Sequence, residues 1–111
     1  MKREFDRLNE LHWGGTLEPI EIVGSRTLEF LGEYICPVHE DEDFIETYRI
    51  VINLNQSRRD QRSTLLHEMC HHAVFLANKQ KHYDEAWSWH GRAWKAEMKR
   101  VGFDGAITEY T

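Results

Sequence analysis

The sequence has few cysteines and no long apolar run. Its 111 residues include only two cysteines, Cys36 and Cys70, which do not form a C-x-x-C pair. This excludes a disulfide framework and a zinc ribbon built from paired cysteines. No run of about 18 apolar residues occurs, so neither a transmembrane helix nor a membrane partner is expected. Residues 1–7 are mostly charged and lack the apolar segment of a signal peptide, which predicts a cytoplasmic protein.

The chain also lacks an overall positive charge, since its formal net charge at pH 7 is −5. An acidic chain is a poor candidate for sequence-independent nucleic-acid binding, which depends on neutralising phosphates. The charge is unevenly spread, because residues 1–46 carry 4 Lys or Arg against 12 Asp or Glu, whereas residues 47–111 carry 10 against 7. A nucleic-acid partner for the mildly basic second part therefore stays open, although a solvated basic face explains the pattern equally well.

The length and the apolar pattern predict one domain, residues 1–111, with a single modest core. The expected elements are helices over 2–12, 58–78 and 88–101, and strands over 19–23, 28–36 and 47–55. Gly32 interrupts the second strand, which indicates a bulge or a close approach of the backbone, and Gly102 is expected to cap the last helix. Because the strand connections are short, we expect an α+β fold with a three-stranded antiparallel sheet and helices on one face.

The most informative stretch is His67-Glu68-Met69-Cys70-His71, an H-E-x-x-H pattern within the apolar segment 64–77. Residues four apart share one face of an α-helix, so His67 and His71 can bind the same metal ion. Glu68 lies beside them, where it can take a proton from a metal-bound water as a general base. Histidine and glutamate need partners when buried among apolar residues, and a metal ion would be such a partner. Internal hydrogen bonds without any metal are the alternative.

A catalytic zinc ion usually has three protein ligands and keeps a fourth position for water. The residues after the motif that can supply the third ligand are His82, Asp84, Glu85 and His90. A glutamate ligand would make the site similar to that of thermolysin. The residue pattern alone therefore leaves all four candidates open, with Glu85 a serious rival to the histidines.

The other histidines and the cysteine of the motif suit this role less well. His72 projects about 100° further around the helix than His71, so we expect it to be packed or exposed rather than bound to the metal. His12 and His39 lie in segments without a ligand-like context. Cys70 is expected to be a small buried side chain, and Cys36 to be structural or free.

Two segments together resemble the SprT-like (spartan-type) zinc metallopeptidase family. Residues 64–71 read T-L-L-H-E-M-C-H and residues 90–94 read H-G-R-A-W, against the family pattern T-L-L-H-E-M-x-H followed by H-G-x-x-F. Trp94 replaces the usual Phe at a packing position. Residues 50–55 are similar to the strand that precedes the active helix in the family, and residues 5–17 are similar to its opening F-x-x-x-L region.

The resemblance implies a small zincin-like domain that binds Zn²⁺ through His67, His71 and His90. It implies hydrolysis of peptide bonds in a protein or peptide substrate by a zinc-activated water, with Glu68 as general base. Larger members of the family carry a zinc ribbon or DNA-binding extensions after the protease core, whereas this sequence ends at Thr111. We therefore expect a minimal protease core, of the kind that a phage or a bacterium encodes, and a weaker case for proteolysis of DNA-bound proteins.

The substrate contacts and an alternative function also follow from the sequence. The candidates for stabilising the oxyanion of the reaction are Tyr83, His72, Arg92 and Tyr110. Strand 47–55 could hold an extended substrate by strand addition if it lies at the sheet edge, and Trp87 or Trp89 could form a wall of the cleft. The alternative to a peptidase is a zinc-containing binding or inhibitory module that acts on a protein or nucleic-acid partner.

Overall fold

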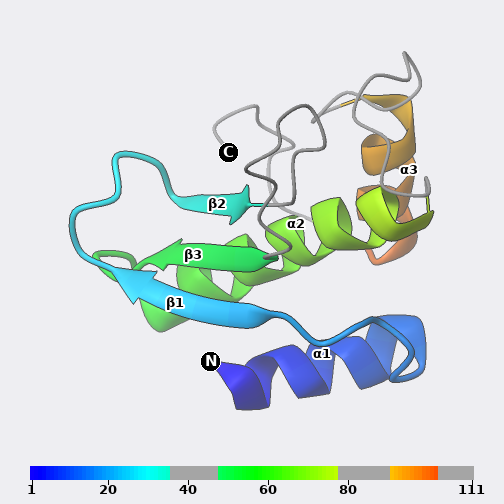
Figure 1. Cartoon of the computed structure of the whole chain (residues 1–111), viewed down its shortest axis with the longest axis horizontal. Coiled ribbons are helices and arrows are strands. Elements are labelled where there is room, and N and C mark those ends of the chain that lie inside the picture. The colour runs from blue at the N-terminus through cyan, green and yellow to red at the C-terminus, as the bar shows by residue number, and fades with distance from the viewer. Residues whose placement is uncertain (36–47, 78–90, 103–111) are drawn as a thin grey trace, which may run out of the picture.

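The computed structural model describes residues 1–35, 48–77 and 91–102. Within these ranges the chain is an α+β fold of three helices and one three-stranded sheet, as expected from the sequence. In chain order the elements are α1 (Lys2–Trp13), β1 (Glu21–Ser25), β2 (Gly32–Ile35), β3 (Arg49–Asn53), α2 (Arg58–Ala77) and α3 (Arg92–Arg100). Figure 1 shows α2 running behind the sheet, α1 below it, and α3 beside the C-terminal half of α2. The predicted tail after Phe103 and the acidic loop 37–43 lie outside the described residues.

The expected three-stranded antiparallel sheet is wrong in its pairing, because the sheet is mixed and its strand order is β1-β3-β2. β3 lies between the other two strands, parallel to β1 and antiparallel to β2. The strand 47–55 that could have bound substrate at an edge is therefore central, with both of its sides paired. Among the described strands, β1 and β2 form the two edges.

The physical reason for this order lies in the most apolar strand and in the connection between β1 and β2. Ile50 and Ile52 of β3 are fully buried, and a strand flanked on both sides buries such β-branched side chains best. The connection 26–31 does not form a tight hairpin but passes around the end of β3. There the Asn53 side chain donates hydrogen bonds to the carbonyls of Leu28 and Phe30, at 3.1 and 3.0 Å.

Helices α1 and α3 both end at a glycine or one residue before it. α1 ends at Gly14, whose φ of 60° is left-handed, and the N–H of Gly14 donates to the carbonyl of Asn9. α3 ends at Val101 and is followed by Gly102, with a φ of 73°. Glycine takes up such positive φ values without the steric cost of a Cβ. The capping glycine predicted for the last helix is therefore confirmed at Gly102.

Helix α2 forms the centre of the core. Its residues from Thr64 to Phe75 are buried with the single exception of the half-buried Leu66. The helix contacts β2, β3, α1 and α3, which explains why this part of it is buried around its whole circumference. The core side chains that surround it are Phe5, Leu8, Leu17, Tyr34, Ile50, Ile52, Trp94, Met98 and Val101.

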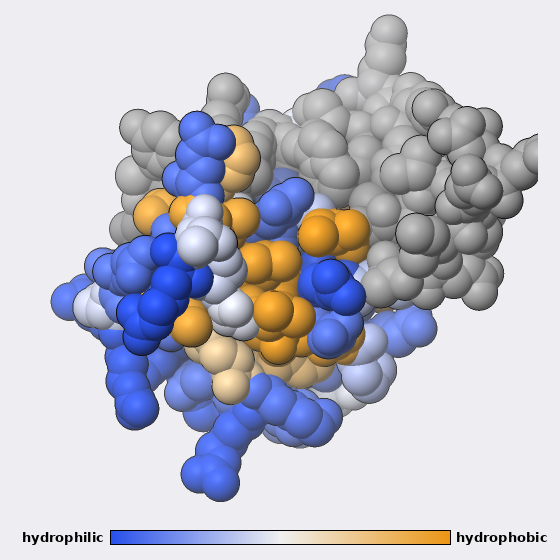
Figure 2. Space-filling view, turned by 60° about the vertical axis from the view of Figure 1, so that its left-hand side comes forward, coloured by the Kyte–Doolittle hydropathy of each residue, from blue (hydrophilic) through white to orange (hydrophobic). Residues whose placement is uncertain are grey.

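The face of the sheet that points away from α2 also carries apolar side chains. Val51 of β3 is paired with Val23 of β1 in register, and Ile35 of β2, on the other side of β3, is paired with Arg49. Figure 2 shows apolar side chains gathered in the middle of this side of the molecule, with hydrophilic ones around them. Phe30 and Leu31, just before β2, are 51% and 45% exposed. In the part of the chain that the structure describes, no helix is long and apolar enough to span a bilayer.

Candidate metal centre

His67, Glu68 and His71 form one buried group on α2. One potential ligand atom from each side chain lies within 4.8 Å of the other two. The Oε1 atom of Glu68 is 3.7 Å from Nε2 of His67 and 3.9 Å from Nε2 of His71. The helical repeat explains this geometry, since residues three and four apart stand on the same face.

The chemistry of this group fits a divalent transition metal. Imidazole nitrogens and carboxylate oxygens are the ordinary ligands of zinc, with bond lengths of about 2.0–2.2 Å, so two nitrogens and an oxygen this close can face one ion. The carboxylate of Glu68 is fully buried, and His67 and His71 are 6% and 3% exposed. A carboxylate is costly to bury in an apolar core unless its charge is compensated, and a cation beside it would compensate that charge.

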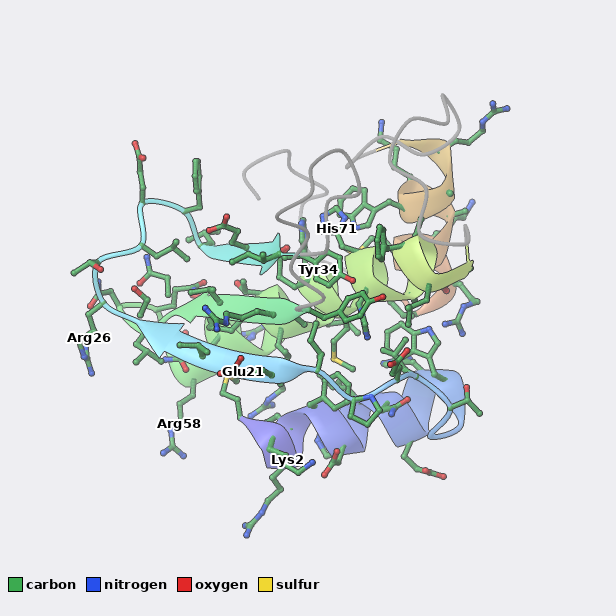
Figure 3. The ribbon with its side chains drawn as sticks, in the orientation of Figure 1. Lys2, Glu21, Arg26, Tyr34, Arg58 and His71 are labelled. Atoms are coloured by element: carbon green, nitrogen blue, oxygen red, sulfur yellow. The ribbon has the colours of Figure 1, made fainter. Side chains whose placement is uncertain are left out.

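Aromatic rings from α3 and β2 pack against the two histidines. The Trp94 indole of α3 lies nearly parallel to the His71 ring, at 12° and 5.0 Å between centroids, and meets the His67 ring at 61° and 4.7 Å. Tyr34 of β2 is also nearly parallel to His71, at 13° and 6.5 Å. Figure 3 shows Tyr34 and His71 next to one another between β2 and α2. The packing role predicted for Trp94 is therefore confirmed.

Gly32 allows β2 to lie against α2 beside this group. A Cβ atom at Gly32 would come within 2.5 Å of Cγ2 of Thr64, 3.2 Å of the Val51 carbonyl and 3.4 Å of Cγ of Glu68. Thr64 cannot easily turn away, because its hydroxyl donates to the side-chain oxygen of Gln56 at 2.9 Å. Of the two sequence predictions for Gly32, the close approach of the backbone is confirmed.

Gly32→Ala is expected to destabilise the protein by about 1–3 kcal/mol, because the new methyl group separates strand from helix. Gly24→Ala is the matched control. Both glycines pair with Ile52 in the sheet, but the three atoms nearest to a Cβ at Gly24 all belong to the side chain of Leu54, which can rotate. Urea denaturation of both variants measures the two losses. Equal losses would contradict the importance of the contact between Gly32 and Thr64.

His72 is packed in the core, which is one of the two outcomes predicted for it. Its Nδ1 lies 2.7 Å from the Tyr34 hydroxyl and its Nε2 lies 2.9 Å from the Glu18 carbonyl. Burial lowers the pKa of His72 to about 4, although the hydrogen bond to Glu18 raises it in part, so the ring is neutral at pH 7. With both nitrogens engaged, His72 is not placed to stabilise an oxyanion.

Cys70 and His12 are separate from the group, as predicted. Cys70 is fully buried, and burial raises the pKa of its thiol well above the usual value. It is therefore a thiol at neutral pH, whereas a metal ligand is a thiolate. His12 lies on α1, where burial, Arg100 and Arg7 lower the pKa of its ring.

Several predicted site residues lie outside the described ranges. These are the third-ligand candidates, two oxyanion candidates, two tryptophans, one histidine and one cysteine: His82, Asp84, Glu85, His90, Tyr83, Tyr110, Trp87, Trp89, His39 and Cys36. Arg92, the remaining oxyanion candidate, is exposed at the start of α3. Tyr34 is the residue that the sequence did not predict at the site. Nothing in its local pattern indicates contact with histidines 37 and 38 positions away.

Comparison with known proteins agrees with this site. The model of the SprT-like family matches residues 1–110, almost the whole chain. A search of curated proteins finds no match.

Proposed function

The chain belongs to the SprT-like family, and from this premise we propose that it is a zinc metallopeptidase that hydrolyses internal peptide bonds. The observation that carries the proposal is the position of the Glu68 carboxylate. It is fully buried, and its Oε1 lies within 3.9 Å of Nε2 of both His67 and His71. A purely structural metal site needs its ligands but has no need of a base beside them.

His67 and His71 are the proposed metal ligands on α2, and Nε2 of each lies within 3.9 Å of Oε1 of Glu68. When bound, a zinc ion would polarise the scissile carbonyl and bring the pKa of a bound water towards about 7. Glu68 acts at its carboxylate oxygens as general base and then as general acid. It accepts a proton from the attacking water and donates a proton to the leaving nitrogen of the peptide.

We propose His90 as the third ligand and keep Glu85 as the rival. The support for His90 is indirect and comes from Trp94, four residues further along the chain. Trp94 packs against both His67 and His71, so the start of α3 lies close to the proposed ligands. The same reasoning gives no comparable support to Glu85.

The proposed substrate is an extended segment of a protein or peptide. β2 is an edge of the sheet among the described strands, and its first residue, Gly32, lies beside Glu68. A substrate that adds to this edge as a further strand would bring a peptide bond near the carboxylate. The exposed side chains of Phe30, Leu31 and Ile35 would favour substrates with apolar residues.

Zinc content tests the ligand set directly. We expect about one zinc ion per chain in the untagged wild-type protein and a loss of zinc in His67→Ala and in His71→Ala. His90→Ala should lose zinc, whereas Glu85→Ala should keep it. His12→Ala, on α1, is the control and should also keep it. Elemental analysis of the folded proteins gives each value.

Other outcomes would change the proposal in defined ways. Loss of zinc in Glu85→Ala, with zinc kept in His90→Ala, would replace the three-histidine site by a thermolysin-like one. Absence of zinc from the wild type, even after incubation with the metal, would overturn the peptidase. A wild type that holds zinc, binds a partner saturably and cleaves nothing would support the alternative, a zinc-containing binding or inhibitory module.

A further inference from the structure

Tyr34 contacts two consecutive histidines of α2 through different parts of its side chain. The side chain comes from the inner face of β2, and Tyr34 is only 6% exposed. Its ring lies nearly parallel to that of His71, at 13°, while its hydroxyl lies 2.7 Å from Nδ1 of His72. One side chain thus joins the proposed ligand His71 to a neighbour that does not bind the metal.

The partners of His72 determine the direction of this hydrogen bond. The Glu18 carbonyl can only accept, so Nε2 of His72, 2.9 Å away, carries the proton. The second nitrogen of a neutral imidazole is an acceptor, so the Tyr34 hydroxyl donates to Nδ1. The Tyr34 hydroxyl therefore donates to His72, and His72 in turn donates to the backbone carbonyl of Glu18, which precedes β1.

The hydrogen bond to His72 fixes the position of the hydroxyl end of the Tyr34 side chain. The ring also makes an edge contact with Phe75, at 6.2 Å between centroids. His71 therefore lies against a tyrosine whose ring cannot easily move away, and it also stacks on Trp94 at 12°. In this orientation Nε2 of His71 is 3.9 Å from the Glu68 carboxylate.

We propose that Tyr34 and His72 are positioning residues for His71, and that their hydrogen bond holds the His71 ring in the orientation in which it binds the metal. The inference rests on the proposed function, because it treats His71 as a metal ligand. Residues that orient a ligand from outside the coordination sphere commonly change metal affinity by about 10- to 100-fold. The alternative is a structural link between β2 and α2 that affects only stability.

Tyr34→Phe removes the hydroxyl and keeps the ring, so it tests the positioning role with little change in packing. We expect Zn²⁺ affinity, measured by competition with a chelator, to fall by about 10-fold or more. The visible absorption spectrum of the Co²⁺-loaded protein should also change, because it reports the ligand geometry. Ile52→Val, a buried change in β3, is the control. It should lower the melting temperature without changing affinity or spectrum.

Tyr34→Phe combined with His72→Leu separates positioning from stability. Replacing both partners of a buried hydrogen bond by apolar groups removes the cost of leaving one partner unsatisfied, so the double variant should be more stable than Tyr34→Phe. For a positioning role, we expect its Zn²⁺ affinity to stay low. Recovery of affinity together with stability would overturn the proposal, as would wild-type affinity in Tyr34→Phe or an equal loss in Ile52→Val. A wild type that binds neither metal would overturn the proposed function as well.

Discussion

Glu68→Gln is expected to slow peptide-bond cleavage by about 100- to 10,000-fold, the usual contribution of a general base. Glutamine has nearly the same shape as glutamate but cannot accept the proton of the attacking water. Its neutral amide is also less costly to bury than a carboxylate, so the fold should be kept. Cleavage of an unfolded protein substrate, followed over time with equal amounts of zinc-loaded protein, measures the effect.

Two measurements make this result specific to Glu68. Zinc content must be the same in Glu68→Gln and in the wild type, because a loss of metal would also abolish activity. Glu10→Gln, an exposed glutamate on α1, should cleave at the wild-type rate. Wild-type cleavage by zinc-loaded Glu68→Gln would refute the role of Glu68 as general base.

Trp94→Ala is expected to cost about 3–5 kcal/mol of unfolding free energy, the range for truncating a buried large aromatic side chain. Trp94 is 1% exposed, and its indole ring packs against the rings of His67 and His71. The whole stability of a domain is only about 5–15 kcal/mol, so this variant should be close to unfolding. Urea denaturation of the zinc-free protein measures the loss of unfolding free energy. In a separate sample purified without removal of metal, the zinc content of the variant should also be lower than that of the wild type.

Two further substitutions in α3 show whether the aromatic ring is responsible. Trp94→Phe keeps an aromatic ring against His67 and His71 and should lose much less stability than Trp94→Ala. Lys95→Ala changes an exposed neighbour and should stay within about 0.5 kcal/mol of the wild type. If Trp94→Ala were as stable as Lys95→Ala, the packing of α3 against the motif helix would have no energetic importance.

The helices and the centre of the site could be predicted because they depend on residues close together in sequence. The H-E-x-x-H spacing places His67, Glu68 and His71 on one face of any α-helix, and the structure has them together. The end of the last helix before Gly102 follows from the backbone freedom of glycine. Local patterns of this kind need no knowledge of the rest of the fold.

The sheet order and the contacts of His72 could not be predicted, because they depend on residues far apart. The short connection between β1 and β2 suggested a hairpin, yet Asn53 bonds to that connection from the end of β3 and β3 separates the two strands. The Tyr34 hydroxyl reaches a histidine 38 positions later. Neither contact has a local signal in the sequence.

The burial of α2 also determines when the site is formed. The stretch from Thr64 to Phe75, which includes His67, Glu68 and His71, is enclosed by the same side chains that make up the core. Its amide hydrogens can exchange with solvent only when that packing opens, and opening a core helix requires nearly the energy of global unfolding. The proposed ligands on α2 are therefore assembled as the chain folds, before any metal binds, and they separate only when the domain unfolds.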